Sequence, residues 1–248
     1  MKLHLNKEIF IKLINDVKEE YGIDSALIEK DYFVTLLLKQ LVDNVPNLIF
    51  KGGTSLSKCH KLIDRFSEDI DVSLEEGYQS GSNRKKLKNT IKEICVNNNL
   101  HLLNEEETRS RRDYNCYRID YNSIFKNPSL NPVLLLETVF IISSFPCEIK
   151  ECSSMIYDYL INSNQKNLID KYELRPFNIK VQALERTFVD KVFAICDYFI
   201  SGKKERNSRH IYDLYKIYPH IKLDNNLKQL FMEIKLLRKE KNSCYSAH

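Results

Sequence analysis

Two acidic residues, separated by one apolar residue inside a segment of alternating polarity, constrain this chain more than any other feature. Residues two apart on a β-strand share a face. In Asp69–Leu74, Asp69 and Asp71 therefore lie on one face and the three apolar residues lie on the other. The apolar face predicts packing against a core. The acidic face brings two carboxylates to ~7 Å at their Cα atoms, which is unfavourable unless a cation lies between them.

A pair of glycines stands shortly before this strand. Leu48–Phe50 predicts a short buried strand, Gly52 and Gly53 follow it, and we expect a helix over Ser55–Asp64. A strand that runs through glycines into a helix allows close backbone approach and leaves N–H groups free, an arrangement that binds phosphate. Further candidate phosphate ligands nearby are the hydroxyls of Ser55 and Ser57 and the ammonium of Lys51 or Lys58.

Carboxylates beside a phosphate site point to magnesium. Mg²⁺ takes one or two carboxylates together with substrate phosphates. Two such ions, about 3.5–4 Å apart, can hold both the attacking and the leaving oxygen of an in-line displacement. Glu137 is the candidate third carboxylate, because it interrupts an otherwise apolar face of the strand that we expect from Val133 to Ser143. The alternative for Glu137 is an ion pair with Arg118 or another base.

Three motifs resemble those of a known family. Lys51–Ser57 taken with Arg65–Asp71 is similar to the first motif of the AbiEii/AbiGii toxins, which belong to the DNA polymerase β-like nucleotidyltransferase superfamily. Glu185–Lys191 resembles the family's helical motif with its lysine, and Arg206–Leu214 resembles its final motif of basic residues followed by an aspartate. The resemblance covers about residues 50–214.

The resemblance implies a nucleotidyltransferase that uses a nucleoside triphosphate (NTP) and two Mg²⁺ ions. The triphosphate would lie over Gly52, Gly53, Thr54 and Ser55, with Ser67 beside them. Asp69 and Asp71 would hold the metal ions, and Glu137 would share the one that activates the acceptor hydroxyl. Lys191 and Arg209 would neutralise phosphate charge, and Asp213 would orient one of these two cations.

The pattern around the later motifs agrees with these roles. On a helix expected to cover residues 183–200, with an apolar stripe that begins at Val181, Lys191 falls at the edge of the stripe and Asp190 points well away from it. A lysine beside a buried face needs a charged partner, for which a triphosphate is one candidate. Arg209 and Asp213 are four residues apart and share a helix face, so the alternative is that they pair with each other.

The order of elements predicts an α+β fold. We expect helices in the first 45 residues, a mixed α/β middle and helices again from about Val181. With the resemblance, this order indicates a nucleotidyltransferase-like mixed sheet core with a helical N-terminal segment and a helical C-terminal half. The predicted division is residues 1–175 for the core with its N-terminal helices and residues 176–248 for the helical region.

Composition excludes some classes and leaves others open. A net charge of +4 is compatible with a nucleic-acid partner without requiring one. No signal peptide is expected, and no segment has the ~18–20 apolar residues that cross a bilayer. Seven scattered cysteines, an odd number, do not form a disulfide framework and favour reduced thiols. We therefore expect a cytoplasmic protein with no membrane contact.

The partners follow from the resemblance alone. It implies an RNA acceptor, with tRNA plausible, a cognate antitoxin, and a role in a toxin–antitoxin or phage-defence system. Two alternatives stay open. One is an NTP-dependent transferase that acts on a hydroxyl of a protein or of a small molecule such as an antibiotic. The other is a non-catalytic module that binds RNA or a partner protein.

Overall fold

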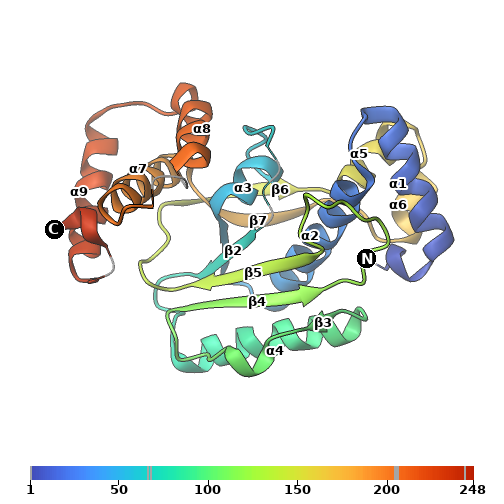
Figure 1. Cartoon of the computed structure of the whole chain (residues 1–248), viewed down its shortest axis with the longest axis horizontal. Helices are drawn as coiled ribbons and strands as arrows, with labels where there is room; N and C mark the ends of the chain where they lie inside the picture. The colour runs from blue at the N-terminus through green and yellow to red at the C-terminus, as the bar shows by residue number, and fades with distance from the viewer. Residues whose placement is uncertain (1, 66, 68, 204–206, 243) are drawn as a thin grey trace.

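The computed structural model describes residues 2–65, 67, 69–203, 207–242 and 244–248. It contains a seven-stranded mixed sheet with helices on both sides and a helical group at one end (Figure 1). The strands are β1 (Leu48–Lys51), β2 (Asp69–Leu74), β3 (His101–Leu102), β4 (Tyr114–Asp120), β5 (Val133–Val139), β6 (Cys147–Cys152) and β7 (Phe177–Gln182). The α-helices are α1 (Lys7–Tyr21), α2 (Ser25–Asn44), α3 (Gly52–Lys58), α4 (Gly81–Asn97), α5 (Met155–Asn162), α6 (Lys166–Lys171), α7 (Leu184–Ile200), α8 (Asn207–Ile217) and α9 (Asn225–Lys239).

The sheet has the order β3-β4-β5-β2-β1-β7-β6. Strand β2 lies near its middle, antiparallel to β1 and parallel to β5. Strand β1 is parallel to β7, and the remaining pairs are antiparallel. This mixed sheet with surrounding helices confirms the predicted fold class, and it places the acidic strand between the glycine bend on one side and Glu137 on the other.

One face of the sheet carries the main core. Ile70 and Val72 of β2 and Leu134 and Leu136 of β5 are buried together with apolar residues of α2 and α4. Figure 1 shows α4 running beneath β4 and β5 on this side. Because side chains alternate along a strand, packing this face leaves the acidic residues on the opposite face.

Helix α2 passes through the core and carries three consecutive buried charges. The Glu29 carboxylate accepts hydrogen bonds from the backbone N–H groups of Ile124 and Phe125, and the Lys30 ammonium donates to the carbonyl of Asn131 at 2.8 Å. Asp31 pairs with Lys58 of α3. Buried charges are tolerated only when paired or hydrogen-bonded, so these contacts attach the 122–131 loop and α3 to one long helix.

The C-terminal helices form a smaller apolar cluster of their own. Val189 and Phe193 of α7 pack against Leu227 and Ile234 of α9. A second small cluster joins this region to the core, in which Ile217 at the end of α8 contacts α3 and the loop that follows it. Figure 1 shows α7, α8 and α9 grouped at one end of the molecule.

The structure differs from the sequence pattern in several places, and β5 ends at Val139, before the expected Ser143. The expected bounds Ser55–Asp64 were wrong: α3 spans Gly52–Lys58, and the positive φ of Lys61 (54°) is incompatible with continuing a right-handed helix. Val181 lies in β7, not at the start of a helix. Between residues 144 and 182 the structure contains β6, α5, α6 and β7, none of which we predicted from the sequence. Because β7 pairs with β1 and β6, the sheet continues past residue 175, and the division at 175/176 stays a prediction.

Within the described ranges, no helix is both long enough and apolar enough to cross a membrane. The seven cysteines are all free thiols, and four of them are buried.

Candidate active site

A row of charged side chains crosses three neighbouring strands. Lys51 of β1 pairs in register with Asp71 of β2, and Asp71 pairs with Glu137 of β5. Register partners on adjacent strands lie on the same face of a sheet, so Lys51, Asp71 and Glu137 stand side by side. Asp69 is on this face as well, two residues before Asp71. We call Asp69, Asp71 and Glu137 the acidic row.

The acidic row is electrostatically strained. Burial, followed by the nearby charge of Glu137, raises the pKa of Asp71 to about 7, although Lys51 acts in the opposite direction. Burial also raises the pKa of Glu137, with Asp69 contributing. Asp71 and Glu137 are register partners on adjacent strands, so their carboxyl groups stand next to each other. Without a cation these carboxylates cannot all be charged at neutral pH.

The glycine bend fits directly against Asp71. Gly52 has a φ of +76°, a conformation that favours glycine, and a Cβ atom there would lie 2.0 Å from Oδ2 of Asp71. A Cβ atom on Gly53 would lie 2.8 Å from Oγ of Ser67 and 2.9 Å from Nη2 of Arg65. The two glycines therefore let the acidic strand and the loop before it approach the start of α3.

The hydroxyl groups after the glycines are used inside the protein. Ser55 is fully buried and donates to the carbonyl of Gly52 at 2.9 Å, and Thr54 donates to the carbonyl of Asp69. Ser57 donates to the carbonyl of Thr54 at 3.0 Å. These bonds hold the bend in place against β2. Contact of Thr54 and Ser55 with a nucleotide stays a prediction, and it would have to come mainly through their backbone N–H groups.

A second charged group is built around Asp213 of α8, which is fully buried. Its carboxylate accepts hydrogen bonds from Nε and Nη2 of Arg65, at 2.8 and 2.6 Å, and from Nζ of Lys191 in α7, at 2.6 Å. Burial works to raise the pKa of Asp213, but these bonds hold it below its usual value. Burial lowers the pKa of Lys191, and Asp213 and Asp71 oppose that shift. We call Arg65, Lys191 and Asp213 the Asp213 cluster.

The partner of Asp213 differs from the alternative that the helix spacing offered. Arg209 is exposed on α8, whereas the Asp213 carboxylate is occupied by Arg65 and Lys191. Lys191 is buried, as its place beside an apolar face predicted. Arg206 of the last motif, and Phe66 and Glu68 of the first, lie outside the described residues. A nucleotide-binding role for Arg209 stays a prediction.

Asp190 and Arg186 form a polar network on the first turns of α7. Asp190 accepts hydrogen bonds from Nε of Arg186 at 3.0 Å and from Gln182 of β7 at 3.0 Å. The buried Arg186 guanidinium also donates to the carbonyls of Ser143 and Phe145. Burial lowers the pKa of the adjacent Lys51, and Asp190 opposes this more than any other charge. The network thus fixes the start of α7 beside the row.

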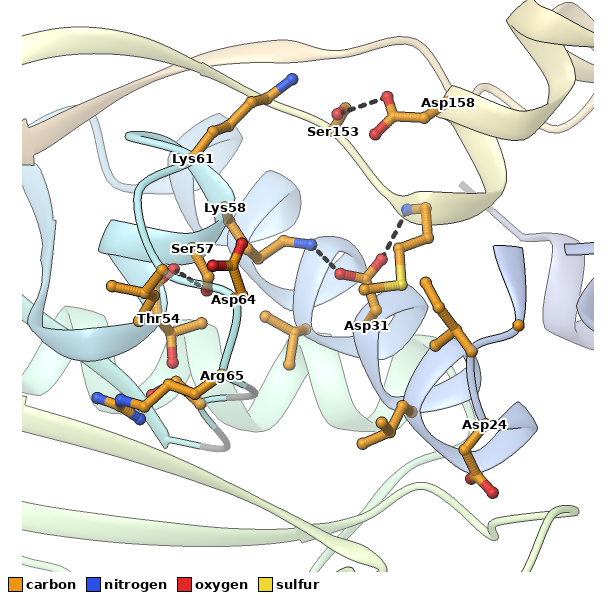
Figure 2. A pocket seen from close by; sticks show the side chains of 17 residues that line it. Asp24, Asp31, Thr54, Ser57, Lys58, Lys61, Asp64, Arg65, Ser153 and Asp158 are labelled. Atoms are coloured by element: carbon orange, nitrogen blue, oxygen red, sulfur yellow. Dashed lines mark hydrogen bonds and ion pairs between the residues drawn. The ribbon is translucent and has the colours of Figure 1, made fainter. Parts of the chain in front are cut away.

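A cavity of about 570 Å³ lies between α2, α3 and the start of α5, and its lining includes Thr54, Arg65 and Ser67. Figure 2 shows the Lys58 side chain pointing across it toward Asp31, which also accepts from the backbone N–H of Met155 at 2.8 Å. Burial opposes the charge of Lys58, but Asp31 raises its pKa above the usual value. The Lys58 ammonium is therefore paired with Asp31.

The residues present fit a divalent cation that is completed by substrate. In the described part of the chain, no three His, Cys, Asp or Glu side chains form a ready-made metal cluster. Asp71 and Glu137 nevertheless stand side by side, and the charge of Glu137 disfavours ionisation of Asp71. Oxygen ligands of this kind suit Mg²⁺, which fills its remaining positions with water and phosphate. The three acids of the row, together with substrate phosphates, match that requirement.

Sequence reasoning did not assign roles to Arg65 or Asp190. Arg65 belongs to the motif that carried the family resemblance, but its partner is 148 positions away in the sequence. The available signal was a basic residue, Arg65, four positions before Asp69, together with an aspartate, Asp213, in the last motif. The helical periodicity placed Asp190 away from the apolar stripe but did not name a partner for it. Its partner Gln182 lies in β7, a strand that was not predicted.

Comparisons with known proteins identify the family of this chain. The family model described as "Nucleotidyl transferase AbiEii toxin, Type IV TA system" matches residues 36–243. Among solved structures, MenT4, a nucleotidyltransferase toxin from Mycobacterium tuberculosis H37Rv, is similar with 18% sequence identity and a TM-score of 0.47; the match covers 74% of this chain and 57% of that one. No sequence among the curated proteins matches. Because the family model covers most of its length, this chain belongs to the AbiEii family of nucleotidyltransferase toxins.

Proposed function

We propose that this protein transfers a nucleoside monophosphate from an NTP to an acceptor hydroxyl, with RNA as the acceptor and tRNA as a plausible form of it. The family supports nucleotidyl transfer as the type of reaction. The observation that carries the proposal is the acidic row, in which Asp71 stands between Lys51 and Glu137 and against the glycine bend.

In this mechanism the triphosphate lies over Gly52–Ser55 and Ser67. Lys191 balances the charge of the phosphates, Arg209 adds a second positive charge at the entrance, and Asp213 holds Lys191 in position. Asp69, Asp71 and Glu137 would hold two Mg²⁺ ions. When bound, Mg²⁺ supplies charge neutralisation and activation of the acceptor hydroxyl. The acceptor oxygen forms a bond to the α-phosphorus while the bond to the β-phosphate oxygen breaks, and pyrophosphate leaves.

The biological setting follows the family. We propose that the protein acts in the cytoplasm as the toxin of a toxin–antitoxin or phage-defence system, and that modification of RNA arrests growth until a cognate antitoxin relieves it. The type IV description of the family supports an antitoxin partner. Co-expression of the neighbouring gene product with the toxin tests this, since it should restore growth.

The direct test is incorporation of labelled nucleotide into total RNA by the wild type, Asp69→Ala and Asp71→Ala. Each of the four NTPs is supplied separately with Mg²⁺, and total protein and a panel of small hydroxyl compounds serve as parallel acceptors. We expect Mg²⁺-dependent labelling of RNA by the wild type and loss of labelling in both variants. Equal labelling by all three proteins would refute the proposal. Labelling of protein or small molecules without labelling of RNA would show that RNA is not the acceptor.

A further inference from the structure

The sheet face that carries the acidic row continues, uncovered, beyond Glu137. On β5, residues on the Glu137 face are partly exposed while their neighbours Leu134, Leu136 and Thr138 are buried. On β4 the same face presents Tyr114, 45% exposed, and Arg118. The opposite, apolar face of these two strands shares the main core cluster with α4. An open face thus begins at the acidic row and extends to the edge of the sheet.

Register places this open face on a definite side of the reacting centre. Across the strands, Cys116 of β4 stands next to Glu137, then come Asp71 and finally Lys51. With strands ~4.8 Å apart, Cys116 lies roughly 10 Å from Asp71. Lys51, a cation that suits a triphosphate, stands on the other side of Asp71 from Glu137, and the charge of Lys191 also acts on Asp71.

An in-line displacement requires the attacking and leaving oxygens on opposite sides of the phosphorus. If pyrophosphate leaves toward Lys51 and Lys191, the acceptor has to enter from the side of Glu137. The open face of β4 and β5 is the surface that the fold provides there.

A small hollow of about 260 Å³ lies on this face. Its lining residues include Arg112, Tyr114, Cys116 and Arg118. The buried Asn104 and Asn115 support it: Asn104 bonds the backbone of Cys116 and Arg118, and Asn115 bonds the backbone of Arg109. These bonds fix the arginine-bearing loop to β4, so the hollow is a preformed feature.

The side chains at the hollow match a nucleotide. Tyr114 offers an aromatic ring for a base, and its hydroxyl donates to Oε1 of Glu137 at 2.8 Å, which ties the hollow to the acidic row. Arg118 is paired with Glu107 at 3.2 Å, but both side chains are about half exposed or more, and such surface pairs are weak enough to be exchanged for a phosphate. Arg112 is exposed beside them.

Ion pairs with α4 leave the segment around the hollow with an excess of arginines. Residues 101–118, which carry the hollow, contain four arginines and four acids. Two of these acids, Glu105 and Asp113, pair with Lys92 and Arg84 of α4, so the four arginines are left with only Glu106 and Glu107 among the acids of the segment.

We infer that the open face of β4 and β5 binds the single-stranded end of an RNA acceptor, with the last base on Tyr114, the phosphates at Arg112 and Arg118, and the terminal hydroxyl directed to Glu137. This inference rests on the proposed transfer to RNA and names the surface that selects it. Stacking on an aromatic ring accepts any base, and phosphate contacts carry no sequence information. The surface therefore recognises a flexible strand end, and sequence choice has to come from elsewhere.

The test separates acceptor binding from NTP binding. The KM for total RNA, the KM for NTP and the affinity for a labelled single-stranded RNA oligonucleotide without NTP are measured for the wild type, Tyr114→Ala, Tyr114→Phe and Arg118→Gln. Arg175→Gln is the matched control, because Arg175 is also an exposed arginine in an exposed ion pair, with Asp170, away from this face.

We expect Tyr114→Ala to raise the KM for RNA about 10-fold. Tyr114→Phe, which keeps the ring, should retain the KM for RNA and lower kcat, because only the bond to Glu137 is lost. Arg118→Gln should weaken oligonucleotide binding and reduce the slope of affinity against salt by about 1. Arg175→Gln should change neither oligonucleotide binding nor its salt dependence. The KM for NTP should stay constant in all variants.

Unchanged RNA binding in Tyr114→Ala and Arg118→Gln would overturn the inference while leaving the transfer reaction intact. Equal losses in Arg118→Gln and Arg175→Gln would also overturn it, since they would show general charge attraction. Conversely, if the wild type binds the oligonucleotide through Tyr114 and Arg118 but labels no RNA, the surface stands and the proposed transfer fails. Faster labelling of protein than of RNA, with both variants altered in protein KM only, would assign the face to a protein acceptor.

Discussion

The acidic row and the Asp213 cluster lie next to each other but are built in opposite ways. In the row, three carboxylates share one sheet face with Lys51, and burial, followed by the charge of Glu137, raises the pKa of Asp71 to about 7. In the cluster, one buried carboxylate holds two cations through three hydrogen bonds of 2.6–2.8 Å. The row is incomplete without a cation, whereas the cluster is satisfied and still leaves an excess positive charge. Together they suit a polyphosphate carried by divalent metal.

The largest expected effect is on the reaction rate. Asp71→Asn keeps the size of the side chain and removes its charge, so we expect the transfer rate to fall about 1,000-fold, equivalent to about 4 kcal/mol of transition-state stabilisation. Rates of nucleotide incorporation under saturating NTP measure this. A rate within tenfold of the wild type would show that the row is not the metal-binding centre.

The next effect is on folding and concerns the cluster. Asp213→Asn leaves Lys191 buried without its anionic partner, and removal of one partner of a buried pair typically costs about 3 kcal/mol or more. Urea unfolding monitored by circular dichroism measures the loss. If the variant were as stable as the wild type, the cluster would not hold α8 against α7 and the 59–65 loop as described.

Substitution in the acidic row is expected to change stability by less, and in the opposite direction. The pKa of Asp71 is about 7 in the folded protein, above its usual value, so the folded state binds the extra proton and its stability falls as pH rises from about 4 to 7. Without metal, Asp71→Asn escapes this loss and should be more stable than the wild type at pH 8, by on the order of 2 kcal/mol. The difference should vanish near pH 4. A variant that is less stable at pH 8 would contradict the strain assigned to the row.

The smallest effect provides the control for both stability measurements. Asp64 lies one residue from Arg65 and pairs with Lys216 of α8 at 2.6 Å, but its side chain is 84% exposed. The pair contributes little because solvent screens it. Asp64→Asn should leave the unfolding midpoint and the transfer rate unchanged. A loss comparable with that of Asp213→Asn would show that exposed contacts, and not the buried carboxylate, hold the loop to α8.

The same contrast explains what the sequence could predict. Alternation in residues 69–74 predicted β2 with its bounds. An acid on an otherwise apolar strand face indicated Glu137 as the candidate third carboxylate. Local periodicity suffices for such features. The position of Glu137 beside Asp71 depends on the parallel pairing of β2 with β5, which the pattern of either strand leaves undetermined.

The Asp213 cluster was harder to predict from the sequence, because its members come from a loop and two helices far apart in the chain. Spacing alone suggested Arg209 as the partner of Asp213, whereas the fold brings Arg65 there. Lys191 was recognised as a buried lysine in need of a partner, but its partner could not be named from periodicity. Strand β7 was missed although Phe177–Gln182 alternates strictly between apolar and polar residues, because Val181 was counted as the first residue of the apolar stripe of the following helix.

The most direct test of the central claim is calorimetry of a non-hydrolysable NTP analogue binding to the wild type and to Asp71→Asn, each with Mg²⁺ and with a chelator. If the acidic row holds divalent cations against the triphosphate, binding to the wild type requires Mg²⁺ and weakens at least about 10-fold in the folded Asp71→Asn variant. Equal affinity with and without Mg²⁺, or equal affinity of the two proteins, would contradict the account.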